Sequence, residues 1–100
     1  MNNTKYQPLE VHPIKETRLY KKYRLAGRDY EDIVIIYLMA HTRGESTRYK
    51  IEVSKNNKDI VNKATDKKVK LMETALNNFN KELRYFKQNG YKITKETEEL

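Results

Sequence analysis

Residues 66–89 read DKKVKLMETALNNFNKELRYFKQN and decide the fold, because apolar residues recur in them at alternating steps of three and four. That period places the apolar side chains on one stripe of an α-helix. Asp66 stands where a helix N-cap belongs, and Gly90 stands where a C-cap belongs. We therefore predict a helix over residues 66–89 with one core-facing stripe, which consists of Val69, Met72, Leu76, Phe79, Leu83 and Phe86.

Something must cover this stripe. The chain has 100 residues, of which 37% are hydrophobic, so it is expected to form one domain with a small core. Either a sheet formed by the preceding residues covers the helix, or a second copy of the chain does. We predict a homodimer that shares the stripe, with the monomer as the alternative.

Residues 47–63 predict a β-hairpin. Tyr49, Ile51 and Val53 alternate with charged residues, which is typical of a half-buried strand. Asn56 and Asn57 follow and form the turn, because asparagine tolerates positive φ. Residues 58–62 then return as the second strand, so the tip of the hairpin is basic, polar and exposed.

Two earlier segments are less clear. Residues 31–40 contain four β-branched residues in succession, from Ile33 to Ile36, which favour a strand buried on both faces. Asp29 is in position to cap a helix there instead. Residues 16–26 fit a strand or a helix equally well, and residues 91–94 fit a short edge strand.

These elements predict an α+β fold in which a small antiparallel sheet, including the 47–63 hairpin, packs on the helix at 66–89. The alternative has helices at 16–26 and 30–41 with the hairpin as a wing. That order of elements is similar to winged-helix DNA-binding proteins, whereas the first order is similar to small single-strand-binding folds. We expect an irregular arm at 1–14, one domain at 15–94 and a flexible tail at 95–100.

The positive charge is concentrated in two blocks. The net charge is +7, and residues 15–28 hold six basic residues against one carboxylate. Residues 48–70 hold eight basic residues against three carboxylates. Blocks of this kind favour a polyanionic partner, most often nucleic acid.

The predicted nucleic-acid site combines the hairpin with the start of the long helix. Lys67 and Lys68 would lie in the first helical turn, where the macrodipole disfavours cations and backbone N–H groups can bind phosphate. Asn56 and Asn57 are the candidates for base contacts. A strand at 16–26 would also align Arg18 and Tyr20 with basic neighbours, a pattern that suits stacking on unpaired bases. The predicted phosphate contacts are Arg48, Lys50, Lys55, Lys58, Lys63, Lys67, Lys68, Lys22 and Arg24.

Together these features predict a non-enzymatic protein that binds double-stranded DNA as an accessory or regulatory factor. The alternatives are a protein-interaction module that binds an acidic partner through the helix stripe, and a binder of single-stranded nucleic acid. The chain has no cysteine, and His12 and His41 lack companions at metal-ligand spacing, so we expect no metal, cofactor or catalytic residue. The longest apolar run, residues 33–40, is too short for a membrane helix, and we expect a cytoplasmic protein without membrane contact.

Overall fold

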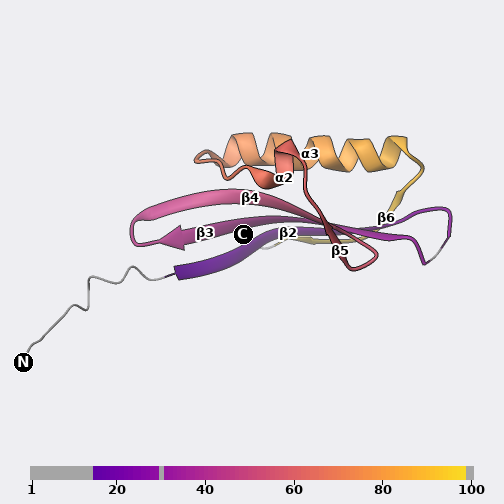
Figure 1. Cartoon of the computed structure of the whole chain (residues 1–100), viewed down its shortest axis with the longest axis horizontal. Coiled ribbons are helices and arrows are strands. Elements are labelled where there is room, and N and C mark those ends of the chain that lie inside the picture. Colours follow the sequence, from indigo (N-terminus) through magenta and orange to yellow (C-terminus); the bar gives the residue numbers. More distant parts are fainter. Residues whose placement is uncertain (1–14, 30, 99–100) are drawn as a thin grey trace, which may run out of the picture.

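The computed structural model describes residues 15–29 and 31–98, in which helices cover one face of a five-stranded antiparallel sheet (Figure 1). The predicted α+β class is therefore confirmed, whereas the predicted arm at 1–14 lies outside the described residues. The strands lie in the spatial order β5-β4-β3-β2-β6. Along the chain the elements are β2 (Lys15–Ala26), β3 (Ile33–Arg43), β4 (Ser46–Lys55), β5 (Lys58–Ile60), α2 (Lys63–Asp66), α3 (Met72–Gln88) and β6 (Lys92–Glu98).

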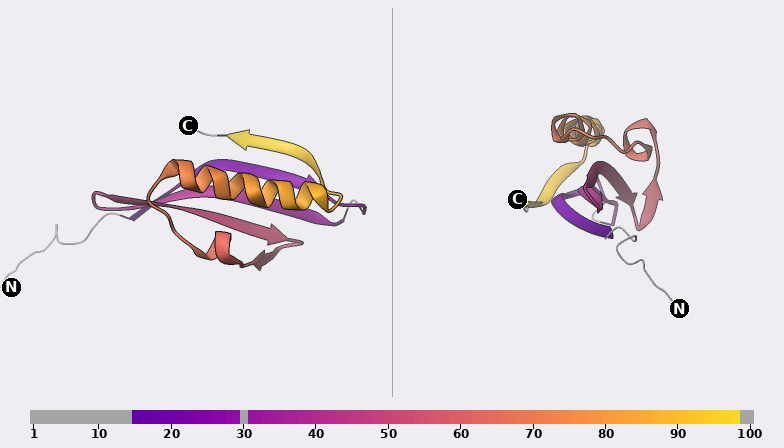
Figure 2. Two further views of the ribbon diagram at one scale, coloured as in Figure 1. Left: turned by 90° about the horizontal axis from the view of Figure 1, so that it is seen from above. Right: turned by 90° about the vertical axis from the view of Figure 1, so that its left-hand side faces the viewer.

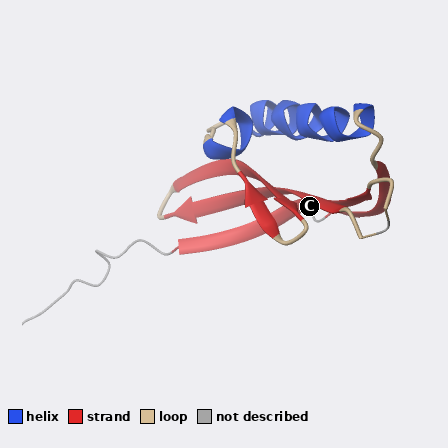
Figure 3. Cartoon of the chain, turned by 45° about the vertical axis from the view of Figure 1, so that its right-hand side comes forward, coloured by secondary structure: helices blue, strands red, loops and turns tan. Residues whose placement is uncertain are grey.

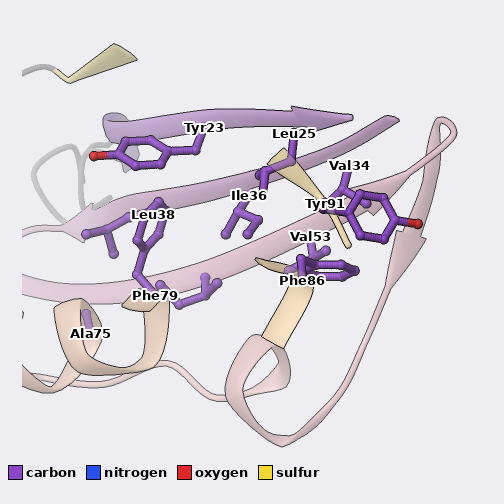
Figure 4. Close-up of a cluster of buried hydrophobic side chains, with 11 residues drawn as sticks. Tyr23, Leu25, Val34, Ile36, Leu38, Val53, Ala75, Phe79, Phe86 and Tyr91 are labelled. Carbon is purple, nitrogen blue, oxygen red and sulfur yellow. The ribbon is translucent and has the colours of Figure 1, made fainter. Parts of the chain in front are cut away.

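Helix α3 packs its apolar stripe on the sheet. Phe79 is fully buried, and its ring lies 5.2 Å from that of Tyr23, centroid to centroid. Ala75 and Phe86 are also buried, and Figure 4 shows all three helical side chains directed toward the strands. The remaining stripe residues pack against this core. The stripe is therefore core-facing as predicted, and the chain's own sheet covers it with side chains of Tyr23, Leu25, Val34, Ile36, Leu38, Ile51 and Val53.

The predicted start of the long helix is wrong. Helix α3 begins at Met72, and Asp66 is the last residue of the short helix α2, whose N-cap is Asn62. Residues 67–71 are not helical, and Val69 exchanges two backbone hydrogen bonds with Tyr49 at 2.8 and 2.9 Å. Val69 therefore faces the same core from a bridge to β4, which explains why it matches the helical period without belonging to the helix.

The predicted C-terminal cap is confirmed. Gly90 has φ +92°, which a glycine adopts without the steric cost of a Cβ atom. The Gly90 N–H donates to the Lys87 carbonyl, and the Tyr91 N–H donates to the Phe86 carbonyl at 3.0 Å. The rings of Phe86 and Tyr91 lie 5.4 Å apart, centroid to centroid, and so complete a Schellman motif with its apolar contact. This turn directs the chain from α3 into β6.

Segments 16–26 and 31–40 are both strands, so the described chain lacks the two helices that the winged-helix alternative requires. Burial alternates along β3, and Val34, Ile36 and Leu38 lie under α3. The prediction that β3 is buried on both faces is wrong. Both helices lie on the same side of the sheet, and the opposite face has no second layer among the described residues (Figures 2 and 3).

The remaining strands follow the predictions except at their ends. The hairpin is present, and its two-residue turn has φ of 52° at Asn56 and 67° at Asn57. Strand β5 ends at Ile60, before Asn62 takes its place as the cap of α2. Strand β6 pairs with β2 and continues to Glu98, so residues 95–98 are a strand and not the predicted flexible tail.

Neither described helix combines the length and the apolar character that a membrane crossing requires.

Replacing Asn56 by glycine is expected to destabilise the domain by about 1 kcal/mol. The Asn56 side-chain carbonyl accepts a hydrogen bond of 2.8 Å from the Ile33 N–H, and this bond ties the hairpin turn to the start of β3. Glycine preserves the positive φ while removing the bond. Asn57→Gly is the matched control, because Asn57 shares the backbone conformation and makes no side-chain hydrogen bond within the described chain. Equal unfolding free energies for the two variants in urea denaturation would contradict the role given to Asn56.

Alkaline pH is expected to lower the free energy of unfolding through Tyr23 and Tyr91. Burial raises the pKa of both phenols above the ordinary value of 10.0, and each hydroxyl donates to a carboxylate, to Glu98 at 3.0 Å and to Asp32 at 2.7 Å. The folded state therefore retains protons that the unfolded state releases above about pH 10, so stability falls as the pH rises beyond that value. Urea denaturation from about pH 8 to about pH 11 measures the decline, and Tyr23→Phe should make it shallower. If the unfolding free energy of Tyr23→Phe fell with pH as steeply as that of the wild type, Tyr23 would not be a source of the alkaline destabilisation.

Candidate nucleic-acid interface

The sheet face opposite α3, called the open face below, has an apolar row along its centre. Strand β3 is the middle strand of the sheet, and its side chains alternate between the two faces. The open-face set is half-buried and is not part of the core cluster on the α3 side. Apolar surface in the middle of an uncovered sheet is typical of a binding surface. The row consists of Ile33, Ile35, Tyr37 and Met39.

Basic side chains flank this row on the β2 side. Lys22 pairs with Tyr37 and Arg24 pairs with Ile35 in the β2–β3 register. Lys95 of β6 pairs with Arg24 and continues the same cross-strand row. The Lys22 ammonium lies 5.7 Å from the centroid of the Tyr37 ring, so a cation and an aromatic surface adjoin at the centre of the open face.

The β4 side of the row is mixed in charge. Lys50 pairs with Met39 and Arg48 pairs with His41, which places both cations on the open face. Glu52 pairs with Tyr37 in the same register, and Asp59 of β5 pairs with Ser54. The β2–β6 side therefore presents cations at the positions where the β4–β5 side presents carboxylates.

A hollow of about 320 Å³ lies at one end of the row. Ile33 and Ile35 contribute apolar surface to it, and Arg24 contributes a guanidinium group. Arg24 donates a hydrogen bond of 3.3 Å from Nη1 to Thr94 Oγ1, which positions the guanidinium beside β6. Glu31, Ser54, Asn56 and Asn57 also line the hollow, so its surface is partly polar. The open face thus combines a hollow of mixed polarity with an oriented cation.

The structure brings only some of the predicted site residues together. Lys22, Arg24, Arg48 and Lys50 share the open face, as their registers show. Asn56 and Asn57 at the hairpin turn line the hollow at the end of this face. The other members lie away from it. They are Lys55 and Lys58 beside the hairpin turn, Lys63 at the start of α2, and Lys67 and Lys68 after α2.

Several of these residues have a different environment from the one predicted. Lys67 and Lys68 precede α3, so the predicted phosphate site in its first turn is wrong. The Lys55 ammonium lies 5.8 Å from the centroid of the Tyr91 ring, on the α3 side. The Asn56 side chain is engaged with Ile33. The hairpin turn is thus tied to its own sheet.

A β-bulge in β2 divides the predicted row of aromatic and basic side chains, so that Arg18 and Tyr20 lie on one face and Lys22 and Arg24 on the other. The register shifts between Leu19 and Lys21, so Tyr20 turns to the α3 side, where its ring lies 6.1 Å from that of Tyr49. Arg18 lies on the α3 side as well, and its guanidinium is 5.3 Å from the centroid of the Tyr20 ring. Lys22 and Arg24 remain on the open face. The aromatic residue beside them is therefore Tyr37 of β3, not Tyr20.

Sequence reasoning missed Tyr37 and Lys95 as candidate site residues. Tyr37 lies in the apolar run that was assigned wholly to the core, and Lys95 lies in the predicted tail. The signal for Tyr37 was its position at an odd number of residues from Val34 and Ile36, which puts it on the other face of the strand. No comparable signal placed Lys95 beside β2.

The described residues offer no second candidate site on the helix stripe or for a metal ion. The stripe of α3 is covered by the sheet, so it no longer supplies a reason for a homodimer or for a protein partner at that surface. Within residues 15–29 and 31–98, no group of three or more His, Asp or Glu side chains is arranged to hold a metal ion. No protein-family model, curated protein or solved structure matches the chain.

Proposed function

We propose that this protein binds nucleic acid, without catalysis, through the open face of its sheet. The observation that carries the proposal is the apolar row of β3 flanked by cations on both sides. Nucleic acid presents the complementary pair of surfaces, because its bases are flat and apolar on their faces and its phosphates are anionic. A protein of this kind would act stoichiometrically, as an accessory or regulatory factor on DNA.

The charge of the whole chain supports the same class of partner. The net charge is +7 and the isoelectric point is about 9.5, so long-range attraction steers polyanions toward the protein. The hairpin offers less support for docking in a duplex groove, since Asn56 and Lys55 are engaged within the fold. The open face is the surface on which the proposal therefore rests.

Fluorescence anisotropy of labelled DNA across a salt series tests the proposal. Three cations on the β2–β6 side of the open face, which are Lys22, Arg24 and Lys95, could each neutralise one phosphate. Full use of them on a single strand gives a slope of log K against log salt of about −2.1. Absence of binding to both single-stranded and duplex DNA at low salt would contradict the proposal.

A further inference from the structure

We infer, on the basis of the proposed function, that the nucleic acid is single-stranded and lies along β3, with a base stacked on Tyr37. The observation behind this inference is the juxtaposition of an aromatic ring and a cation at the centre of the sheet face that no other described element covers. The inference names the class of nucleic acid and the residue that distinguishes it from a duplex.

The open face suits exposed bases better than paired ones. In a duplex the faces of the bases are stacked on each other, so only base edges and the sugar-phosphate backbone are accessible. The apolar row of β3 offers aromatic and aliphatic surface, which gains most from contact with the faces of unpaired bases. Single-stranded nucleic acid therefore uses the whole chemistry of the open face, whereas a duplex would use its cations alone.

The apolar row has room for several bases. Ile35 and Met39 lie two residues on either side of Tyr37, about 7 Å along the strand in each direction. Bases that continue from the one on Tyr37 would meet aliphatic side chains on both sides, and the hollow near Ile35 extends the row. The strand direction of β3 is thus the natural direction of the bound chain.

The backbone of the nucleic acid is expected on the β2–β6 side of this row. Arg24 and Lys95 pair with each other there, and Lys22 lies two residues before Arg24 on the same face of β2. Glu52 and Asp59 lie on the other side and would repel phosphates. This asymmetry assigns the phosphates to one flank and directs the bases across Tyr37.

Substitution of Tyr37 tests the inference. Tyr37→Ile preserves strand propensity and removes the aromatic face, whereas Tyr37→Phe preserves that face. Dissociation constants are measured for a labelled oligothymidine and for a labelled DNA hairpin duplex. We expect the wild type to bind oligothymidine more tightly, and we expect Tyr37→Ile to weaken that binding about five- to a hundred-fold without changing duplex binding. Tyr37→Phe should bind like the wild type.

Two controls keep the result specific to stacking. Tyr85→Ile removes a tyrosine ring that is 58% exposed on α3, and it should leave both dissociation constants unchanged. Circular dichroism and thermal unfolding report whether each variant folds. If Tyr37→Ile does not fold, Tyr37→Thr replaces it, since threonine also favours strands.

The outcomes separate this inference from the proposed function. Equal affinity of the wild type for both probes, or unchanged oligothymidine binding by folded Tyr37→Ile, would overturn the single-strand inference while nucleic-acid binding still stood. Failure of the wild type to bind either probe would overturn the proposed function itself, and the inference with it.

Discussion

Replacing Phe79 by alanine is expected to lower the free energy of unfolding by about 3–5 kcal/mol. Phe79 is fully buried at the middle of α3, and its ring meets that of Tyr23 edge to face. Alanine would leave a cavity between the helix and the sheet, because the surrounding strands cannot collapse into the space. A small domain is stable by only about 5–15 kcal/mol, so this variant should be close to unfolding at room temperature. Urea denaturation followed by circular dichroism measures the change.

Asn80→Ala is the matched control for Phe79→Ala. Asn80 is the next residue of the same helix and is exposed, so its replacement should change the unfolding free energy by less than about 0.5 kcal/mol. A loss below about 1 kcal/mol for Phe79→Ala would show that α3 does not cover the sheet as described. The sheet would then have no face that α3 covers, and the distinction between a covered face and the open face would fail for the described residues.

Reversing both cations on the open face of β2 is expected to weaken nucleic-acid binding by on the order of a hundred-fold at low salt. Lys22→Glu with Arg24→Glu removes two phosphate contacts and sets two carboxylates beside the proposed path of the backbone. The slope of log K against log salt should become shallower by about 1.4, because about 0.7 is lost for each phosphate contact with a single strand. Anisotropy titrations at several salt concentrations measure both quantities.

The control for this double reversal has the same change in net charge at another surface. Lys81→Glu with Lys87→Glu places the reversals at exposed positions of α3. These substitutions should weaken binding only through the long-range field, by less than about ten-fold. If both double variants lose affinity equally, binding depends on net charge and not on the open face.

The long helix and the hairpin were predictable from sequence because each has a strong local signal. The stripe from Met72 to Phe86 follows the helical period, and Asn56 with Asn57 specifies a turn with positive φ. The helix start was not predictable in the same way. Val69 fits the helical period from outside the helix, because a bridge to Tyr49 turns it toward the same core. Periodicity reports which core a residue faces, not the backbone conformation that brings it there.

The open face could not be predicted from the apolar run in β3. A strand with apolar residues at every position has the same sequence whether a second layer covers it or a ligand does. The registers that place Lys22, Tyr37 and Lys95 in neighbouring rows depend on the bulge in β2 and on the pairing of β6. The bulge appears only in the pairing of β2 with β3, and β6 returns to the sheet only after α3, so neither can be seen in a local stretch of sequence. Four of the predicted cations nevertheless lie on the open face. The hairpin that contains β4 was predicted, whereas residues 16–26, which form β2, fitted a strand and a helix equally well.

Mapping of bound oligothymidine by NMR tests the central claim most directly. Titration of the isotope-labelled protein should shift the signals of the Tyr37 ring and of amides along β2, β3 and β6, where Lys22, Arg24 and Lys95 lie. The outer side of α3 should show little change. Shifts concentrated on α3, with the Tyr37 ring unaffected, would contradict the assignment of the open face as the nucleic-acid-binding surface.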